Sequence, residues 1–291
     1  MPPGAGCSRR AAIAVLGGWV AASLVGLTKM TRARADEGNE PEIMRYGPGP
    51  SQFAELSLPA GSAAAPVVLI VHGGFWRTGF GVDLGRPLAA DLVRRGFATV
   101  NVEYRRVGTG PSGGGGWPQT GQDLAAATDA LATEGQRLAG GRLDLSRVVG
   151  LGHSAGGQLV GWLGARRSPV VTLCGVVSQA GVLDLVDAAH AGVGGGAVED
   201  FMGASPDQKP AAYADASPLA RTPLGVPSVC VHGRADDVVP IRLSERFVAA
   251  ARAVGDTSEL RAFDGGHFDL IAVGSPAWSL CVAALTDLTR G

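Results

Sequence analysis

The chain has 291 residues and a formal net charge of −1, and its 46% hydrophobic content is enough for the core of one α/β domain of ordinary size. The sequence has no basic stripe interleaved with aromatic residues, so we do not expect the protein to bind nucleic acid. Aromatic residues make up only 5% of the chain, so we expect a core built mainly from Val, Leu and Ala.

The first 35 residues predict an export signal rather than part of the fold. Arg9 and Arg10 precede an uncharged apolar run over residues 11–27, and a short basic segment then ends in Ala33-Arg34-Ala35. This order is typical of a cleavable signal, and the paired arginines resemble a twin-arginine signal. The alternative is an uncleaved membrane anchor, although the run is short for a span of about 20 residues. We therefore expect a periplasmic or extracellular protein of residues 36–291, with no stable membrane partner after cleavage.

Strands and helices alternate from residue 52 onward. Buried apolar runs predict strands, and apolar residues three to four positions apart predict helices. The expected strands cover residues 52–58 (at the sheet edge), 67–71, 97–102, 147–151, 170–177, 226–231 and 259–263. The expected helices cover residues 84–95, 120–131, 157–163, 243–254 and the segment after Ser275-Pro276. This alternation predicts an α/β fold with a mostly parallel central sheet and helices on both faces.

Local signals mark helix ends and two irregular segments. Gly96 is expected as a helix C-cap, residues 120–123 as a capping box, and Ser275 as an N-cap. The glycine-rich segment 108–116 follows a strand at the edge where α/β sites form, and a plain spacer is favoured there over a flap near substrate. Residues 183–219 are long for a connection, and we expect them to form a small cap over the site.

One serine lies in a sequence that predicts a nucleophile elbow. Gly152-His153-Ser154-Ala155-Gly156 follows a short β-branched strand and precedes a helical apolar pattern, which is the context that a G-x-S-x-G elbow requires. The helix N-terminus favours negative charge near the Ser154 hydroxyl. The same residues also fit a loose dinucleotide fingerprint. That alternative requires an acid at the end of the next strand, where Ser178 and Gln179 stand instead, so the elbow is favoured.

A serine nucleophile needs a histidine base and an acid that orients the base, and elbow hydrolases place them in the chain order Ser, acid, His. Of the five histidines, His267 is the one that follows Ser154 with a well-placed acid between them. Gly265-Gly266 frees its loop to present the imidazole. His232 is expected to pack or hydrogen-bond at its strand end.

Two adjacent aspartates compete for the role of the acid. Asp236 and Asp237 both follow the strand at 226–231, and we predict that Asp236 orients His267, with Asp237 as the alternative. The other of the two is expected to cap the helix that follows. Asp184, after the preceding strand, is a distant third.

The sequence His-Gly-Gly-Phe-Trp at residues 72–76 predicts an oxyanion loop. The elbow supplies one donor, the backbone N–H of Ala155, and the second is expected from Gly74 and Phe75, because glycines let N–H groups turn toward substrate. His72 is expected to be structural. Trp76 is predicted to line the substrate pocket, with core packing as the alternative.

No cofactor or metal is expected. A metal alternative lacks His-x-x-x-His or Cys-x-x-Cys spacing, and it would draw on Asp236, Asp237, His267 and Asp269. The cysteines of the expected domain are too scattered for a disulfide framework, although a single pair stays an alternative. We expect them as small buried hydrophobes at Cys174, Cys230 and Cys281.

Together, the elbow, the His-Gly-Gly loop and the acid and histidine that follow them resemble the α/β-hydrolase superfamily, in its esterase/lipase branch. The run at 72–76 is also similar to the H-G-G-aromatic-W sequence of kynurenine formamidases and related bacterial carboxylesterases. The resemblance runs from about Tyr46 to the C-terminus. It implies the α/β-hydrolase fold, nucleophile Ser154, acid Asp236, base His267 and no cofactor. Phe75 replaces the third glycine of H-G-G-G loops, which argues against a tertiary-alcohol esterase.

The activity implied is hydrolysis of small carboxylic esters through an acyl-enzyme. The superfamily also contains acetylxylan and feruloyl esterases and the catalytic domains of prolyl-peptidases, so the fold does not fix the substrate. Amide or formamide hydrolysis is the alternative, and a peptidase is less expected because the chain lacks room for a propeller domain. A non-catalytic binding protein on the same fold is disfavoured by the intact triad. A small-molecule acyl ester or amide is therefore the expected partner.

Overall fold

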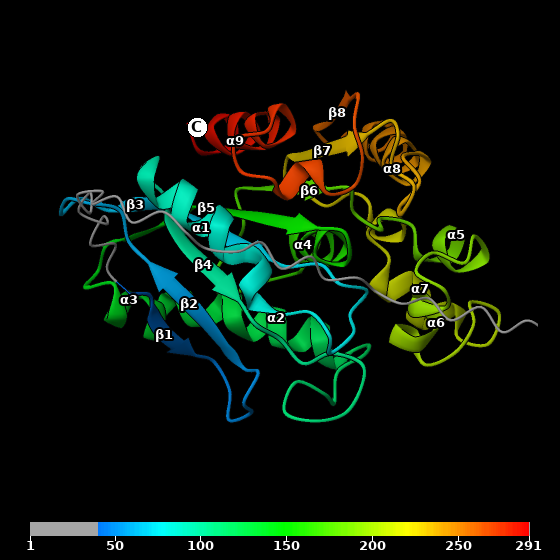
Figure 1. Cartoon of the computed structure of the whole chain (residues 1–291), viewed down its shortest axis with the longest axis horizontal. Coiled ribbons are helices and arrows are strands. Elements are labelled where there is room, and N and C mark those ends of the chain that lie inside the picture. The colour runs from blue at the N-terminus through cyan, green and yellow to red at the C-terminus, as the bar shows by residue number, and fades with distance from the viewer. Residues whose placement is uncertain (1–39, 291) are drawn as a thin grey trace, which may run out of the picture. The chain divides into compact units, whose positions relative to one another are not determined.

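A sheet with one reversed strand forms the centre of residues 40–290, the residues that the computed structural model describes (Figure 1). Its strands are β1 (Glu42–Arg45), β2 (Phe53–Ser57), β3 (Ala65–Val71), β4 (Ala98–Val102), β5 (Leu143–His153), β6 (Gly175–Gln179), β7 (Ser228–Gly233) and β8 (Ser258–Phe263). They are hydrogen-bonded in the order β1-β2-β4-β3-β5-β6-β7-β8, and β2 is antiparallel to both of its neighbours. All pairs from β4 to β8 are parallel, which confirms the mostly parallel sheet predicted from the sequence.

Helices connect the strands and carry the chain across the sheet. They are α1 (Arg86–Arg94), α2 (Gln119–Asp129), α3 (Glu134–Leu138), α4 (Ala155–Gly164), α5 (Leu185–His190), α6 (Ala197–Met202), α7 (Pro210–Ala216), α8 (Arg242–Ala253) and α9 (Pro276–Thr289). Short 3₁₀ turns add η1 (Val82–Gly85), η2 (Ala130–Ala132), η3 (Pro218–Arg221) and η4 (Asp269–Ile271). Between residues 40 and 290, no helix combines the length and the apolar character needed to cross a membrane. The predicted export signal at residues 1–35 lies outside the described residues.

The alternation of side chains along β3 explains why helices cover both faces of the sheet. Leu69 packs in a core cluster with Leu124 of α2 and Leu159 of α4. Its neighbour Ile70 packs in a second cluster with Trp278 of α9. Successive residues of a strand point to opposite faces, so one apolar run serves two cores. The expected helices on both faces are confirmed.

The strand predictions differ from the structure mainly in three places. The strand predicted at 147–151 is longer in the structure, because β5 begins at Leu143 and already pairs there with Ala65 of β3. The segment predicted as the edge strand is β2, and β1 lies outside it, because a single buried side chain, Met44, gives β1 almost no apolar signal. The strand predicted at 170–177 begins only at Gly175, where pairing with β5 starts. Val171 and Leu173 are buried without joining the sheet, so their apolar character reflects packing rather than strand pairing.

Of the three predicted helix caps, two are confirmed by the structure and one is wrong. Gly96 has φ 93° in the position after the C-cap residue Arg95, and its N–H donates to the Val93 carbonyl, so it closes α1 as predicted. The Ser275 hydroxyl accepts the Trp278 N–H at 2.9 Å, which confirms the predicted N-cap. The capping box at 120–123 is wrong, because Thr120 lies inside α2 and its hydroxyl donates to the Arg105 carbonyl at 2.7 Å. A capping-box pattern covers only four consecutive residues, so it could not predict a hydrogen bond to Arg105.

The connection between β6 and β7 carries α5, α6, α7 and η3, in the segment expected to form a cap at 183–219. Figure 1 shows these helices on the side of the sheet where β5 ends. Phe201 of α6 stacks on Trp76, with ring centroids 4.5 Å apart, and its carbonyl accepts the Trp117 N–H at 2.8 Å. The insertion is therefore packed against the loop at 72–76, and its action as a cap over substrate stays a prediction.

Candidate active site

Ser154 lies at the turn between β5 and α4, as the predicted elbow requires. Its φ of 55° and ψ of −117° are rare for a residue with a side chain, and such strain concentrates at functional sites. The turn also packs tightly on β3, because a Cβ on Gly156 would lie 2.1 Å from the Val71 carbonyl oxygen. The Ser154 N–H donates to the Gln179 carbonyl at 2.8 Å, which fixes the turn to the end of β6.

The loop after β3 holds its backbone in an unusual conformation. Gly74, Phe75 and Trp76 have positive φ values of 106°, 56° and 54° in succession. Within residues 40–290, the N–H groups of Gly74, Phe75 and Ala155 donate no hydrogen bond. Free backbone donors at a helix N-terminus and in an adjoining strained loop are what stabilisation of an oxyanion needs.

The buried side chain of His72 packs beneath this loop, on the side facing the protein interior. It is 2% exposed, and its ring stacks on Tyr104 with centroids 4.3 Å apart. Its Nδ1 lies 2.7 Å from the Gly73 carbonyl oxygen, and the Tyr104 hydroxyl donates to the His72 carbonyl at 2.8 Å. These contacts agree with the expectation that His72 is structural.

Asp236 and His267 meet at the ends of β7 and β8. His267 Nδ1 lies 2.7 Å from Asp236 Oδ2, and at most 2% of either side chain is exposed. The two loops are joined by a hydrogen bond from the Ala235 N–H to the Gly265 carbonyl at 3.0 Å. Because a carboxylate only accepts, Nδ1 carries the proton and Nε2 is left as the basic nitrogen.

Asp236 is held as a carboxylate by several donors. Burial opposes its ionisation, but hydrogen bonds from His232 and His267 and from the Val239 N–H lower the pKa of Asp236 well below its usual range. His232 Nε2 lies 3.3 Å from Asp236 Oδ2 and 2.8 Å from the Val239 carbonyl oxygen. The sequence predicted that His232 packs or hydrogen-bonds at its strand end. Its contact with the acid was not predicted, because that contact depends on how the loop after β7 folds back.

His153 is a site residue that the sequence analysis passed over. Its ring centroid lies 4.5 Å from that of His267, and its Nε2 lies 3.0 Å from the His267 carbonyl oxygen. The signal was its position inside the elbow motif, directly before Ser154. Chain order alone favoured His267 as the base, and only the fold shows that the two rings touch.

The structure separates the competing acids. Asp237 is exposed, and within the described residues its carboxylate accepts no hydrogen bond, so it caps no helix. Asp184 is the N-cap of α5 and pairs with Arg246 at 3.0 Å. Asp269 accepts the Gly266 N–H at 2.8 Å and so shapes the loop before His267. Asp236 is therefore the aspartate that contacts His267.

Trp76 and the cysteines lie in the interior. Trp76 is 1% exposed, and its indole N–H donates to Gln158 Oε1 at 3.0 Å. These surroundings match the core-packing alternative, and contact of Trp76 with substrate stays a prediction. Cys230 and Cys281 are buried as expected, Cys174 is partly buried, and none of the three forms a disulfide.

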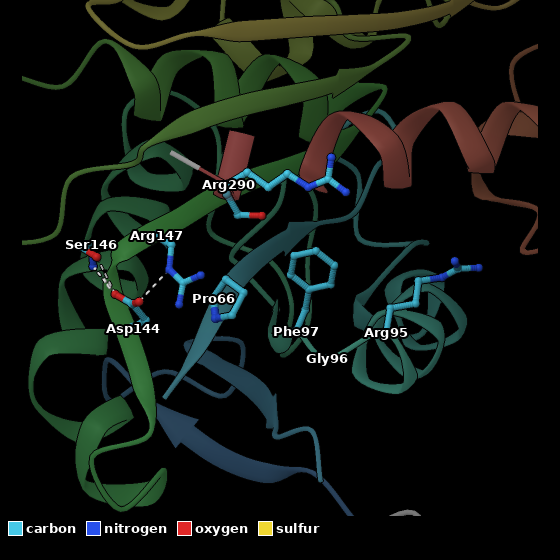
Figure 2. A pocket seen from close by; sticks show the side chains of 9 residues that line it. Pro66, Arg95, Gly96, Phe97, Asp144, Ser146, Arg147 and Arg290 are labelled. Atoms are coloured by element: carbon cyan, nitrogen blue, oxygen red, sulfur yellow. Dashed lines mark hydrogen bonds and ion pairs between the residues drawn. The ribbon is translucent and has the colours of Figure 1, made fainter. Parts of the chain in front are cut away.

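Two hollows among the described residues lie away from this site. Figure 2 shows one of about 710 Å³, beside the starts of β3, β4 and β5, lined by Pro66, Phe97, Arg147 and Arg290 among others. It opens at the opposite ends of the strands from Ser154, and Arg147 there already pairs with Asp144 at 2.7 Å. A second, of about 690 Å³, is lined by α5, α7 and neighbouring segments. In parallel α/β sheets the chemistry takes place at the carboxyl ends of the strands, so the first hollow is not the candidate site. The residues that line the second include none of Ser154, Asp236 and His267.

A protein family and a known esterase are similar to this chain in sequence. The family model described as BD-FAE matches residues 55–250. Esterase LipC of Mycobacterium tuberculosis is 25% identical over 248 residues, which are 78% of this chain and 59% of LipC, so the chain spans less than two thirds of that relative.

Solved structures resemble the fold along most of its length. A truncated carbohydrate esterase from gut microbiota has a TM-score of 0.71 at 18% identity, covering 88% of this chain and 99% of that one. Thermogutta terrifontis esterase 2, phosphoramylated by tabun, has a TM-score of 0.68 at 19% identity, covering 86% and 94%. These similarities confirm the α/β-hydrolase fold expected from the sequence.

Proposed function

The chain belongs to the BD-FAE family, and from this premise we propose that it is a serine hydrolase that cleaves small carboxylic esters through an acyl-enzyme. The observation that carries the proposal is the Asp236–His267 pair at 2.7 Å, on the loops next to a strained Ser154. The 25% identity with an esterase supports ester bonds as the substrate class.

The proposed first step is attack by Ser154 on the ester carbonyl. His267 Nε2 takes the hydroxyl proton, while Asp236 holds Nδ1–H and stabilises the imidazolium that forms. The N–H groups of Ala155, Gly74 and Phe75 stabilise the oxyanion. The imidazolium then gives its proton to the leaving alkoxide, and the alcohol departs.

Water completes the proposed cycle. His267 removes a proton from water, the hydroxide attacks the acyl carbonyl, and the proton returns to Ser154 as the acid leaves. Within residues 40–290, no hydrogen bond joins the Ser154 hydroxyl to His267, and such contacts often tighten only when substrate is bound. His153 cannot replace His267 as the base, because its Nε2 faces a carbonyl and, among residues 40–290, no carboxylate is hydrogen-bonded to its ring.

The test is turnover of short p-nitrophenyl esters by wild type and by Ser154→Ala. We expect wild type to hydrolyse the acetate and butyrate esters, and Ser154→Ala to lose on the order of 10⁶ in kcat. The matched p-nitroanilides measure amide preference in the same assay. Ester turnover that survives in Ser154→Ala would reject Ser154 as the nucleophile.

We also propose that the protein acts outside the cytoplasm. The support is the order of Arg9-Arg10, the apolar run and Ala33-Arg34-Ala35 in the sequence. N-terminal sequencing of the exported form is expected to begin near Asp36. An exported chain that still begins at Met1 would instead indicate an anchor.

A further inference from the structure

His153 is enclosed between two segments of the candidate site. It is 6% exposed, and its Nε2 lies 3.0 Å from the backbone carbonyl oxygen of His267. A carbonyl oxygen only accepts, so Nε2 of His153 carries the proton and donates it. This hydrogen bond links the last residue of β5 to the residue proposed as the base, 114 positions along the chain.

The other side of the His153 ring faces the oxyanion loop. A Cβ added to Gly73 would lie 3.1 Å from His153 Nδ1 and 3.1 Å from Ser154 Cβ. The ring therefore fills the space between Gly73 and His267, and Gly73 leaves just enough room for it. One side chain thus touches both the oxyanion loop (residues 72–76) and the loop that carries the proposed base (residues 265–268, the base loop). It also directly precedes the proposed nucleophile in the chain.

The hydrogen bonds that fix the base loop on its N-terminal side do not reach His267 itself. The Gly265 carbonyl accepts the Ala235 N–H at 3.0 Å, and the Gly266 N–H donates to Asp269 at 2.8 Å. Phe268, which follows, is 63% exposed, and its ring lies edge-on to that of His267 with centroids 5.2 Å apart. The Asp236 carboxylate holds the His267 ring, whereas His153 holds the His267 main chain. With both points fixed, the ring has little freedom to turn away from Ser154.

His153 occupies this position without charge. Burial and the neighbouring His267 lower the pKa of His153 to about 3, against the smaller influence of Asp236. His267, Asp236 and His232 are the titratable groups that act on it most strongly. A neutral neighbour does not repel the imidazolium that forms on His267 during the reaction.

We propose that His153 is a positioning residue for the catalytic base, holding the main chain of His267 so that its ring lies between Asp236 and Ser154. The expected effect on kcat rests on the proposed function, whereas the expected effect on the position of the His267 ring does not. The effect on kcat and the position of the ring are therefore tested by separate measurements.

The kinetic test compares two amides of different reach. His153→Gln places an N–H donor near the position of Nε2, whereas the amide of His153→Asn reaches only to the position of Nδ1. A misplacement of about 1 Å costs on the order of 100-fold, so we expect His153→Asn to lower kcat about 10- to 100-fold, with KM within about threefold. His153→Gln is expected to recover most of the rate. Exposed Glu245→Gln, on α8, is the control and is expected to keep wild-type kinetics.

The second measurement needs no activity. In the proton NMR spectrum, the His267 Nδ1–H that bonds to Asp236 is expected as a low-field signal in wild type and His153→Gln, and as a broadened or lost signal in His153→Asn. Thermal unfolding of each variant shows whether it is folded.

The outcomes separate the two proposals. A folded His153→Asn with wild-type kcat and an unchanged low-field signal would overturn the role of His153, and so would equal losses in the two amide variants. If wild type hydrolyses no ester, the proposed function fails. In that case the low-field signal alone decides whether His153 positions His267.

Discussion

At the scale of single residues, one carboxylate orients the proposed base. Asp236 contacts two histidines and two backbone N–H groups, and its side chain is fully buried. Its neighbour Asp237 is exposed. Adjacent residues of the same type therefore have opposite environments, and the choice between them becomes a matter of geometry.

This contrast predicts unequal effects of a matched pair of substitutions. Asp236→Asn is expected to lower kcat on the order of 10⁴-fold, because an amide no longer fixes the tautomer of His267. Asp237→Asn is expected to keep kcat within about twofold, as a surface change remote from the reacting atoms does. Steady-state kinetics on one ester decide the matter, and a larger loss in Asp237→Asn would transfer the role of the acid.

The buried His153 predicts a pH dependence of stability. Its pKa is lowered to about 3 in the folded protein, whereas an unfolded histidine ionises near 6.5. Between these values the unfolded chain binds more protons, so stability is full above about pH 6.5 and is lost as the pH falls toward 3. Thermal unfolding from pH 7 to 4 should show a steeper loss of Tm in wild type than in His153→Gln. Parallel curves would contradict the buried neutral state of His153.

At the scale of elements, the elbow joins β3, β5 and α4 with no spare volume. The first turn of α4 approaches the end of β3 so closely that a Cβ at Gly156 would lie 2.1 Å from a backbone oxygen. This approach brings the N-terminus of α4 beside the oxyanion loop, which leaves β3 at the same point. The donors proposed for the oxyanion are therefore placed by packing between elements.

Gly156→Ala tests this packing. Overpacking a filled site costs about 1–3 kcal/mol, which for a domain of this size lowers Tm by roughly 2–12 °C. Gly79→Ala is the control, because a Cβ there would meet no atom within 4 Å. Differential scanning fluorimetry gives both values. Equal Tm values for the two variants would show that the elbow can accommodate a Cβ at Gly156, which would contradict the tight packing seen in the structure.

The elements themselves show what a sequence reveals and what it leaves out. The strand β3 has a continuous apolar run, and its predicted bounds lie within two residues of the observed ends, because full burial favours apolar residues at every position. β1 was missed because only Met44 is buried in it. The capping box failed because Thr120 bonds to Arg105, a partner outside its own helix. An apolar pattern within one segment predicts burial well, but a pattern within one segment cannot predict hydrogen bonds to residues far along the chain.

At the scale of the whole molecule, the sheet order gathers residues that are far apart in the chain. The loops after β3, β5, β7 and β8 carry the residues at 72–76, Ser154, Asp236 and His267. Motif order predicts a functional residue after each of these strands, but it leaves Asp237 as the alternative to Asp236, and only the contact with His267 separates the two. Contacts that depend on how the loops fold back, such as His153 on His267 and His232 on Asp236, required the three-dimensional structure.

The most direct test of the central claim is covalent labelling by a fluorophosphonate, followed by intact-mass and peptide analysis. We predict one adduct per chain, located on Ser154, with loss of ester hydrolysis in proportion to labelling and no adduct on Ser154→Ala. An adduct on a different residue, or hydrolysis that persists in fully labelled protein, would contradict the assignment of Ser154 as the nucleophile.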